Sequence, residues 1–395
     1  MSLYKEKKIA GFFIFVNLFY LTQGIVPALG SLYTLMLLIL LVISAYYFVI
    51  VNTTYNKSVF IKALNILVLM FTVYGFLHFL DPLEEIRSII PDYRAYTYLT
   101  NAYKPLLQIY PLYYFSRKGY IDEDVIKTWI IPATLCALAA FYVKNQEISI
   151  SLLTNDVVGT TNNTGYLIVS VIPLLFFSKK NIISYSILAI VIAFVFISSK
   201  RGAIILAALC TVWFIFFDLK MSPARKKLWV IPLVIVAGVV LFVFLSRIFE
   251  ESYYMQYVYE KTLDGDSSGR DVLYNKAWDH FINKSSFTTM LLGNGADSTY
   301  CIIGNRAHND WLELLMNQGL LGVFVYLFFW FSIFKTWLRN KSQKFIYAVL
   351  GSIIILFFLR TLVSMLYNDL SPIACLPFAW CMAYCDSKSV KYKNS

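Results

Sequence analysis

The sequence predicts an all-α integral membrane protein with about 12 transmembrane helices and both termini in the cytoplasm. Its 395 residues are 59% hydrophobic and only 14% charged, whereas soluble domains carry about 25% charged residues. Apolar runs of about 20 residues, the length that spans a bilayer, follow one another along the chain. Short basic clusters separate alternate runs. The net charge of +11 is therefore assigned to membrane topology, and nucleic acid is not expected as a partner.

The order of apolar runs and polar breaks fixes the expected topology. A lysine cluster at residues 5–8 precedes the first run, but a second run follows at once, so we expect an uncleaved first helix. With the amino terminus inside, every alternate break is basic, as at residues 117–118 and 179–180. The expected spans begin near residues 9, 31, 59, 98, 124, 164, 182, 202, 228, 316, 343 and 369.

One long connection divides the chain into three parts. Residues 1–247 are expected to hold the first nine spans, and residues 311–395 the last three spans and a cytoplasmic tail. Residues 248–310 between them form an outer loop with an amphipathic helix. Functional residues concentrate on such loops, so we expect the chemistry there. A second outer segment, residues 81–97, is expected to lie along the membrane interface.

Two cations occupy the turn between the seventh and eighth expected spans. In FISSKRGAIIL, residues 196–206, Lys200 and Arg201 interrupt a long apolar stretch. Free N–H groups at the start of the next helix and the positive end of its dipole add to their charge. The turn is a candidate anion site. The alternative is that both side chains extend to lipid phosphates.

The outer loop contains DGDSSGRDVLYNKAWDHFIN, residues 264–283, which predicts a turn followed by an amphipathic helix. Ser268 and Asp271 are the expected capping pair. Arg270 then falls in the first turn, where a basic side chain opposes the helix dipole, so we expect it to bind an anion. A solvated arginine is the alternative. The expected apolar face consists of Leu273, Ala277, Trp278, Phe281 and Ile282.

The segment GNRAHNDWLELLMNQGLLG, residues 304–322, places His308 at the start of a helix that Gly319 ends or kinks. The other two histidines, His78 and His280, are expected to be structural or solvated. His308 stands where the loop meets the membrane, and the near-neutral pKa of histidine suits proton transfer there. A structural role is its alternative. No second His or Cys lies at ligand spacing, so no metal is expected.

Further cations lie within the spans or close to their outer ends. Arg360 interrupts the eleventh span and Lys104 the fourth, and an ionisable residue inside a span is a functional hypothesis by default. The structural alternative is pairing with Asp369 or Asp81. The lower-ranked candidates for substrate binding, chosen on position, are Arg94, Lys104, Arg306 and Arg360.

Three segments, in this order, resemble the O-antigen ligase and O-antigen polymerase superfamily: SKRGA around Arg201, SGR ending at Arg270, and HNDWLELLMNQGLLG beginning at His308. The LLGNG stretch, residues 291–295, also resembles the segment before the histidine in this family. The motifs cover residues 150–330, and the topology resembles the family over the whole chain. The histidine segment is the most specific of the motifs.

The resemblance implies a glycosyltransferase of the bacterial inner membrane whose active site faces the periplasm. Its donor and acceptor would be oligosaccharides on undecaprenyl diphosphate, with no cofactor and no metal, and a chain-length regulator is a further partner left open. Arg201 and Arg270 would hold the diphosphate, with Lys200 beside them. His308 would position or deprotonate the acceptor hydroxyl. This fits the residue chemistry, since arginine forks suit phosphates and a neutral imidazole accepts protons.

Two other activities remain open besides that of a polymerase, which joins a growing glycan to a lipid-linked repeat unit. A ligase moves the finished glycan onto lipid A core, and the motifs do not separate the two. The short chain, the modest loop and the abundance of Tyr, Phe, Ile and Lys favour the polymerase, because they resemble strain-variable polysaccharide-cluster proteins. A transporter for lipid-linked sugars would show repeated halves with matched broken helices, and we find neither.

Overall fold

A computed structural model describes residues 3–23, 25, 29–81, 96–153, 163–178, 181–223, 269–367 and 369–391, with shorter pieces between 83 and 94 and between 232 and 260. These residues form helices, and no strand occurs among them. Within this part of the chain, five helices are long and apolar enough to cross a membrane: α2 (Gly30–Thr54), α3 (Val59–Leu80), α12 (Arg201–Met221), α18 (Asp310–Arg339) and α19 (Lys344–Val363).

The all-helical class and the apolar spans are thus confirmed, whereas the full number of spans and their orientation stay predictions. Most of the ninth expected span, which begins near residue 228, lies outside the described residues. The remaining helices are α1 (Leu3–Tyr20), α4 (Glu85–Ile89), α5 (Tyr96–Leu107), α6 (Ile109–Arg117), α7 (Glu123–Thr128), α8 (Ile130–Leu153), α9 (Thr164–Val169), α10 (Ile172–Leu175), α11 (Asn181–Ile197), α15 (Arg270–Asp279), α16 (Phe287–Leu292), α17 (Thr299–Ile303) and α20 (Pro372–Lys391), with a π-helix, η2 (His280–Lys284), after α15.

The fourth, fifth and sixth expected spans are each broken into two helices, which periodicity alone does not predict. The breaks separate α5 from α6, α7 from α8, and α9 from α10. Each downstream helix carries a proline near its start, at Pro111, Pro132 and Pro173. Proline has no N–H to donate within a helix and is tolerated mainly in the first turn, so it favours a new start over a continuous helix.

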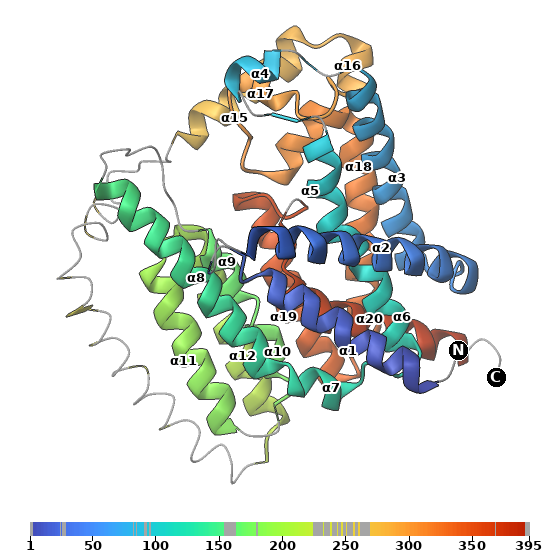
Figure 1. The fold of residues 1–395 in the computed structure, drawn as a ribbon, viewed down its shortest axis with the longest axis vertical. Helices are drawn as coiled ribbons and strands as arrows, with labels where there is room; N and C mark the ends of the chain where they lie inside the picture. The colour runs from blue at the N-terminus through green and yellow to red at the C-terminus, as the bar shows by residue number, and fades with distance from the viewer. Residues whose placement is uncertain are drawn as a thin grey trace.

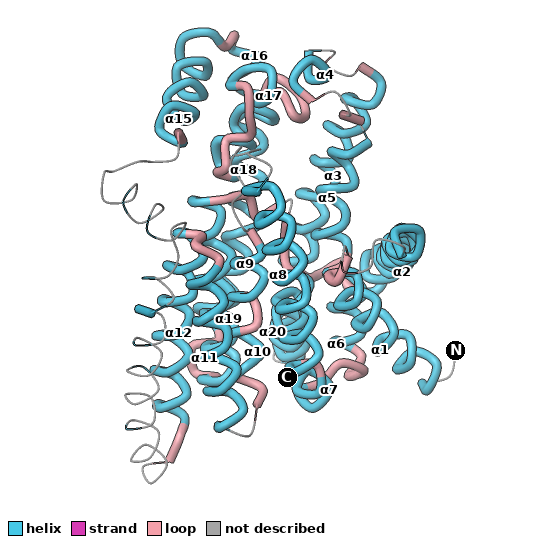
Figure 2. The backbone as a smooth tube through the Cα atoms, turned by 60° about the vertical axis from the view of Figure 1, so that its left-hand side comes forward, coloured by secondary structure: helices cyan, strands magenta, loops and turns pink. Residues whose placement is uncertain are grey.

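The helices are arranged in a spanning body with a cap at one end (Figure 1). Helices α3, α5 and α18 lie side by side, and the short helices α4, α15, α16 and α17 lie above their ends in both Figures 1 and 2. We call residues 269–309 together with α4 the cap. Helix α19 packs against α12, α18 and α20. The last turn of α19 contacts the SGR and HND motifs through Arg270 and Asn309.

Backbone contact between two glycines joins the cap to α18. Gly319 kinks α18, with φ 64° and ψ −159°. At the kink, the carbonyls of residues 316–317 accept hydrogen bonds from the N–H groups of residues 294–295, at 2.9 and 3.0 Å. A Cβ on Gly319 would lie 2.5 Å from the nitrogen of Gly293, and one on Gly293 would lie 2.3 Å from a carbonyl oxygen of α18. The predicted kink at Gly319 is confirmed, and it explains why the LLGNG and NQG stretches occur together.

We expect Gly319→Ala and Gly293→Ala to destabilise the protein more than Gly119→Ala. All three glycines have positive φ, but a Cβ on Gly119 meets nothing within 4 Å. Gly119→Ala, the control, should therefore lower the free energy of unfolding only by the strain of a left-handed backbone, about 1–2 kcal/mol. Gly319→Ala and Gly293→Ala should lower it further, because their Cβ atoms also clash with backbone atoms. Thermal unfolding of the purified protein in detergent measures the difference. Equal losses for all three variants would show that the close approach is not required.

Candidate active site

Three segments that are far apart in the sequence meet at the carboxyl-terminal end of α19. Arg270 Nη1 donates to the carbonyl of Val363 at 2.8 Å, and Asn309 Nδ2 donates to the carbonyl of Leu362 at 3.0 Å. A Cβ on Gly202 would lie 3.3 Å from a methyl group of Val363. The last carbonyls of a helix have no partners within it and form the negative end of its dipole, so they attract donors. The SKRGA, SGR and HND motifs therefore converge on one site.

The residues that converge there are mostly basic. Lys200 is the residue before α12 and Arg201 is its first residue, and both are half-buried. Burial, together with the positive charges of Arg270 and Arg360, lowers the pKa of Lys200 to about 8. Because these three side chains repel one another's charge, an anion placed among them would be stabilised. We call Lys200, Arg201, Arg270, Arg360 and His308 the cationic cluster.

His308 lies on the loop just before α18, since Asn309 is the N-cap of that helix. Its backbone adopts a left-handed conformation, with φ 52°. Burial and the positive charges of Arg270, Lys200 and Arg306 lower the pKa of its imidazole below the usual value of 6.5. A group with a lowered pKa is neutral at pH 7, so the ring can accept a proton there.

Two buried carboxylates at the start of α18 hold the segments around His308. Asp310 and Glu313 are both 0% exposed. Glu313 Oε2 accepts a hydrogen bond from the N–H of Ala307 at 2.8 Å, which fixes the residue before the histidine. Asp310 accepts from the N–H of Leu366 at 2.9 Å and from the hydroxyl of Tyr326 at 2.7 Å. These acids are part of the HNDWLE motif, but sequence reasoning assigned them no role.

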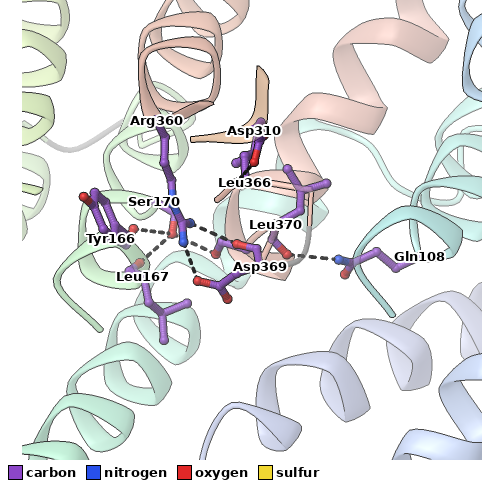
Figure 3. Close-up of polar contacts among 10 residues, drawn as sticks. Gln108, Tyr166, Leu167, Ser170, Asp310, Arg360, Leu366, Asp369 and Leu370 are labelled. Carbon is purple, nitrogen blue, oxygen red and sulfur yellow. Dashed lines mark hydrogen bonds and ion pairs between the residues drawn. The ribbon is translucent and has the colours of Figure 1, made fainter. Parts of the chain in front are cut away.

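Arg360 pairs with Asp369, one of the two partners that the structural alternative names (Figure 3), while its role in substrate binding stays a prediction. Its Nη2 bonds the Asp369 carboxylate, its Nη1 donates to the backbone carbonyl of Asp369 at 2.9 Å, and its guanidinium lies 4.5 Å from the ring centre of Tyr166. Tyr166 was missed by sequence reasoning. Its only signal was a lone tyrosine at the start of an apolar run.

Arg306 lies beside the cluster rather than in it. Its guanidinium is 5.6 Å from the ring centre of Tyr300, and it interacts electrostatically with Tyr300, Asp297 and Glu313. It also contributes to the lowered pKa of His308. Arg306 therefore influences the proposed base through its charge, while its own closest partners are in the cap.

The other two lower-ranked candidates have partners elsewhere. Lys104 is exposed, and its ammonium lies 4.2 Å from the ring centre of Tyr20 in α1. The alternative that Lys104 pairs with Asp81 is therefore wrong. Arg94 is exposed and donates to the hydroxyl of Tyr96 at 3.0 Å. The printed partners of both side chains thus lie outside the cationic cluster, and their roles in substrate binding stay predictions.

The start of the loop helix differs from the expected one. Arg270 lies in the first turn of the loop helix, as predicted, but α15 begins at Arg270 itself, and its N-cap is Gly269 in a left-handed conformation, with φ 74° and no side-chain cap. Ser268, which was the expected N-cap, lies outside the described residues. Glycine adopts positive φ without steric cost, which explains the change of cap.

The expected apolar face of the loop helix is only partly correct. Ala277 is buried, and Leu273 and Phe281 pack against the same small core. Trp278 and Ile282, however, are 52% and 50% exposed. The α-helix ends at Asp279 and continues as the π-helix η2, so the helical period changes there.

No metal-ligand spacing occurs in the sequence, and the described residues contain no group of three His, Cys, Asp or Glu side chains that would hold a metal ion. The expected absence of metals and cofactors stays a prediction. The chemistry available at this site is the binding of an anion by arginine and lysine next to a neutral imidazole.

We expect Arg270→Gln to raise the pKa of His308, because it removes a neighbouring positive charge. The pH dependence of labelling by diethyl pyrocarbonate, which reacts with neutral imidazole, should shift to higher pH when His308 is followed by mass spectrometry. Lys276→Gln, which removes an exposed cation further along α15, should leave the midpoint unchanged. An unshifted midpoint in Arg270→Gln would show that the two side chains are not electrostatically coupled.

The comparisons with known proteins identify the segment that carries this site. Residues 185–327 match a family model described as O-antigen ligase. The matched range includes Lys200, Arg201, Arg270 and His308, and it continues past the kink at Gly319. No curated protein matches the chain at a significant level. Together with the apolar helices, the match confirms that the chain resembles a membrane-bound member of the O-antigen ligase and polymerase superfamily.

Proposed function

We propose that this protein is a glycosyltransferase of the O-antigen polymerase type, which acts at the periplasmic face of the bacterial inner membrane. It transfers a growing glycan from undecaprenyl diphosphate onto a lipid-linked repeat unit. The observation that carries the proposal is the convergence of Lys200, Arg270 and His308 near the end of α19 within the matched segment, with Arg201 next to Lys200 in the chain. A site that binds a diphosphate and removes a proton needs those side chains.

The cations bind the leaving group, which is the diphosphate. Arg201 occupies the first turn of α12, where the free N–H groups and the helix dipole also favour an anion. One N–H of Arg270 is bonded to the carbonyl of Val363, which holds the guanidinium at the end of α19, where its charge acts on Lys200 and His308. Arginine binds phosphate oxygens through two parallel hydrogen bonds. Preorganised donors of this kind stabilise the charge that develops on the departing diphosphate.

His308 takes the proton from the acceptor hydroxyl. The hydroxyl oxygen of the acceptor sugar attacks the anomeric carbon of the donor glycan, and the bond from that carbon to the diphosphate oxygen breaks. The hydroxyl proton moves to the neutral imidazole, and the bonding electrons leave with the diphosphate. The products are the extended lipid-linked glycan and undecaprenyl diphosphate. The lowered pKa of His308 keeps the imidazole unprotonated before the reaction.

A ligase, which transfers the glycan to lipid A core, is the second candidate function. The matched model is itself described as O-antigen ligase, so the family match supports it equally. The two activities share the donor and differ only in the acceptor. The short chain, the modest loop and the composition of the sequence favour the polymerase.

The glycan banding pattern of a host that lacks this gene tests the activity. In the deletion strain, core with a single repeat unit identifies a polymerase, whereas bare core with accumulated lipid-linked polymer identifies a ligase. Wild-type protein should restore the bands, and His308→Ala at matched expression should not, because it lacks the base. His280→Ala, which changes a histidine of the cap outside the cluster, is the matched control and should restore them. Full restoration by His308→Ala would remove the proposed base.

Diphosphate binding should weaken as the pH rises through about 8, the lowered pKa of Lys200. Lys200 is charged below this pH and neutral above it, and loss of one charged contact weakens binding by about tenfold. Titration of the purified protein with farnesyl diphosphate at pH 7 and pH 9 measures this effect. Lys200→Arg keeps its charge at both pH values and should bind equally at both. A wild-type affinity that does not change with pH would contradict the role of Lys200.

A further inference from the structure

We infer that Arg360 is a third arginine for the substrate diphosphate, and that the carboxylate of Asp369 occupies its phosphate-binding position until the substrate displaces it. The inference rests on the proposed function, because it assumes that the cationic cluster binds a lipid-linked diphosphate. It gives the Arg360–Asp369 ion pair a role that changes during the reaction cycle. The alternative is a permanent ion pair that only stabilises the fold.

The two partners of this ion pair differ sharply in exposure. The side chain of Arg360 is 4% exposed, whereas that of Asp369 is 69% exposed. A buried guanidinium without an anion is costly, whereas an exposed carboxylate is well solvated when it leaves. Another anion can therefore replace Asp369 at little cost, provided that it also neutralises Arg360. Phosphate oxygens match the arginine fork as well as a carboxylate does.

Arg360 also has an unused hydrogen-bond donor. Its Nε is buried and has no partner in the described part of the chain. Asp369 engages Nη1 and Nη2 through its carbonyl and its carboxylate. A buried donor left unsatisfied costs free energy, so a ligand with more acceptor oxygens than one carboxylate fits this guanidinium better. A diphosphate is such a ligand.

The backbone that carries Asp369 is fixed, so only its side chain has to move. Between α19 and α20, the described residues 364–367 and 369–371 are held by hydrogen bonds from three other segments (Figure 3). Their anchoring hydrogen bonds are Leu366 N to Asp310 Oδ1 at 2.9 Å, Gln108 Nε2 to Leu370 O at 3.3 Å, and Ser170 Oγ to Ser371 Oγ at 2.7 Å. Displacement of the carboxylate therefore requires a side-chain rotation and no refolding of the turn.

The position of Arg360 connects it to the diphosphate site on one side and to a groove on the other. Its charge contributes to the lowered pKa of Lys200, and Tyr166, on which it stacks, has its hydroxyl 2.3 Å from the Cβ position of Gly202 in the SKRGA turn. Asp369 also lines a largely apolar groove between α1, α2 and α5, together with Lys104. Lys104, in the lining of this groove, carries the charge opposite to that of the displaced carboxylate.

The test compares binding of farnesyl diphosphate to the purified full-length protein in four forms: wild type, Asp369→Asn, Arg360→Gln and the double variant. Asp369→Asn should tighten binding about two- to fivefold, because releasing an ion pair with an exposed partner costs little. Arg360→Gln should weaken binding. In the double variant the gain from Asp369→Asn should disappear, because the carboxylate competes only through Arg360. A gain of the same size in both backgrounds would reflect general electrostatics and overturn the inference.

Two controls keep the result interpretable. Asp279→Asn removes the carboxylate of an exposed ion pair with Lys284, 3.3 Å apart and outside the cluster, and should leave the affinity unchanged. Asp369→Asn keeps the backbone bond to Arg360 and should fold, which thermal unfolding checks. Unchanged affinity with lower stability in both single variants would identify a permanent structural pair.

Failure of the inference is distinguishable from failure of the proposed function. If Arg201→Ala and Arg270→Ala lose farnesyl diphosphate while Asp369→Asn shows no gain, only the displacement of Asp369 is wrong. If Arg201→Ala and Arg270→Ala both bind like wild type, the diphosphate site itself is wrong.

Discussion

The arrangement of the site depends on the unsatisfied carbonyls at the end of α19. A helix end inside a protein must find donors, and here Arg270 and Asn309 supply them from two different segments of the chain. The same two bonds bring the cap and the start of α18 next to the SKRGA turn. Like charges accumulate in this place at an electrostatic cost, and after burial they are the second cause of the lowered pKa of Lys200. The anion that we propose as ligand would relieve that cost.

Buried acids complement this arrangement on the other side of His308. Asp310 and Glu313 accept backbone and side-chain donors and so tie Leu366, which follows α19, and the loop at Ala307 to α18. Neither carboxylate bonds a residue of the cationic cluster directly, so the positive charge of the cluster is not neutralised by them. A direct pair does exist at Arg360, and its anionic partner is the exposed Asp369. The buried carboxylates of Asp310 and Glu313 thus hold segments of the chain together, whereas the carboxylate of Asp369 is the one that we propose is displaced by the substrate.

The sequence predicts the all-helical class, most helix starts and the three motifs that converge, because hydropathy and local residue order determine them. It does not predict that Pro111, Pro132 and Pro173 divide three spans, since hydropathy is continuous across each break. Tyr166 and the roles of Asp310 and Glu313 were also missed. Their partners are distant in the sequence, and such contacts leave no periodic signal in a single chain. The pairing of Arg360 with Asp369 was foreseen only as one of two alternatives.

The left-handed backbone at His308 restricts which residues that position can hold during evolution. Asn, Asp and Gly adopt positive φ most readily, and β-branched residues are strongly disfavoured. Asn and Gly cannot accept a proton at neutral pH, and an Asp among these cations would neutralise the charge that the donor needs. The substitutions that preserve the loop therefore remove the proposed base. A variant with such a substitution would keep the fold of the loop and the cations of the cluster, so the proposed base could be lost without loss of the proposed binding site.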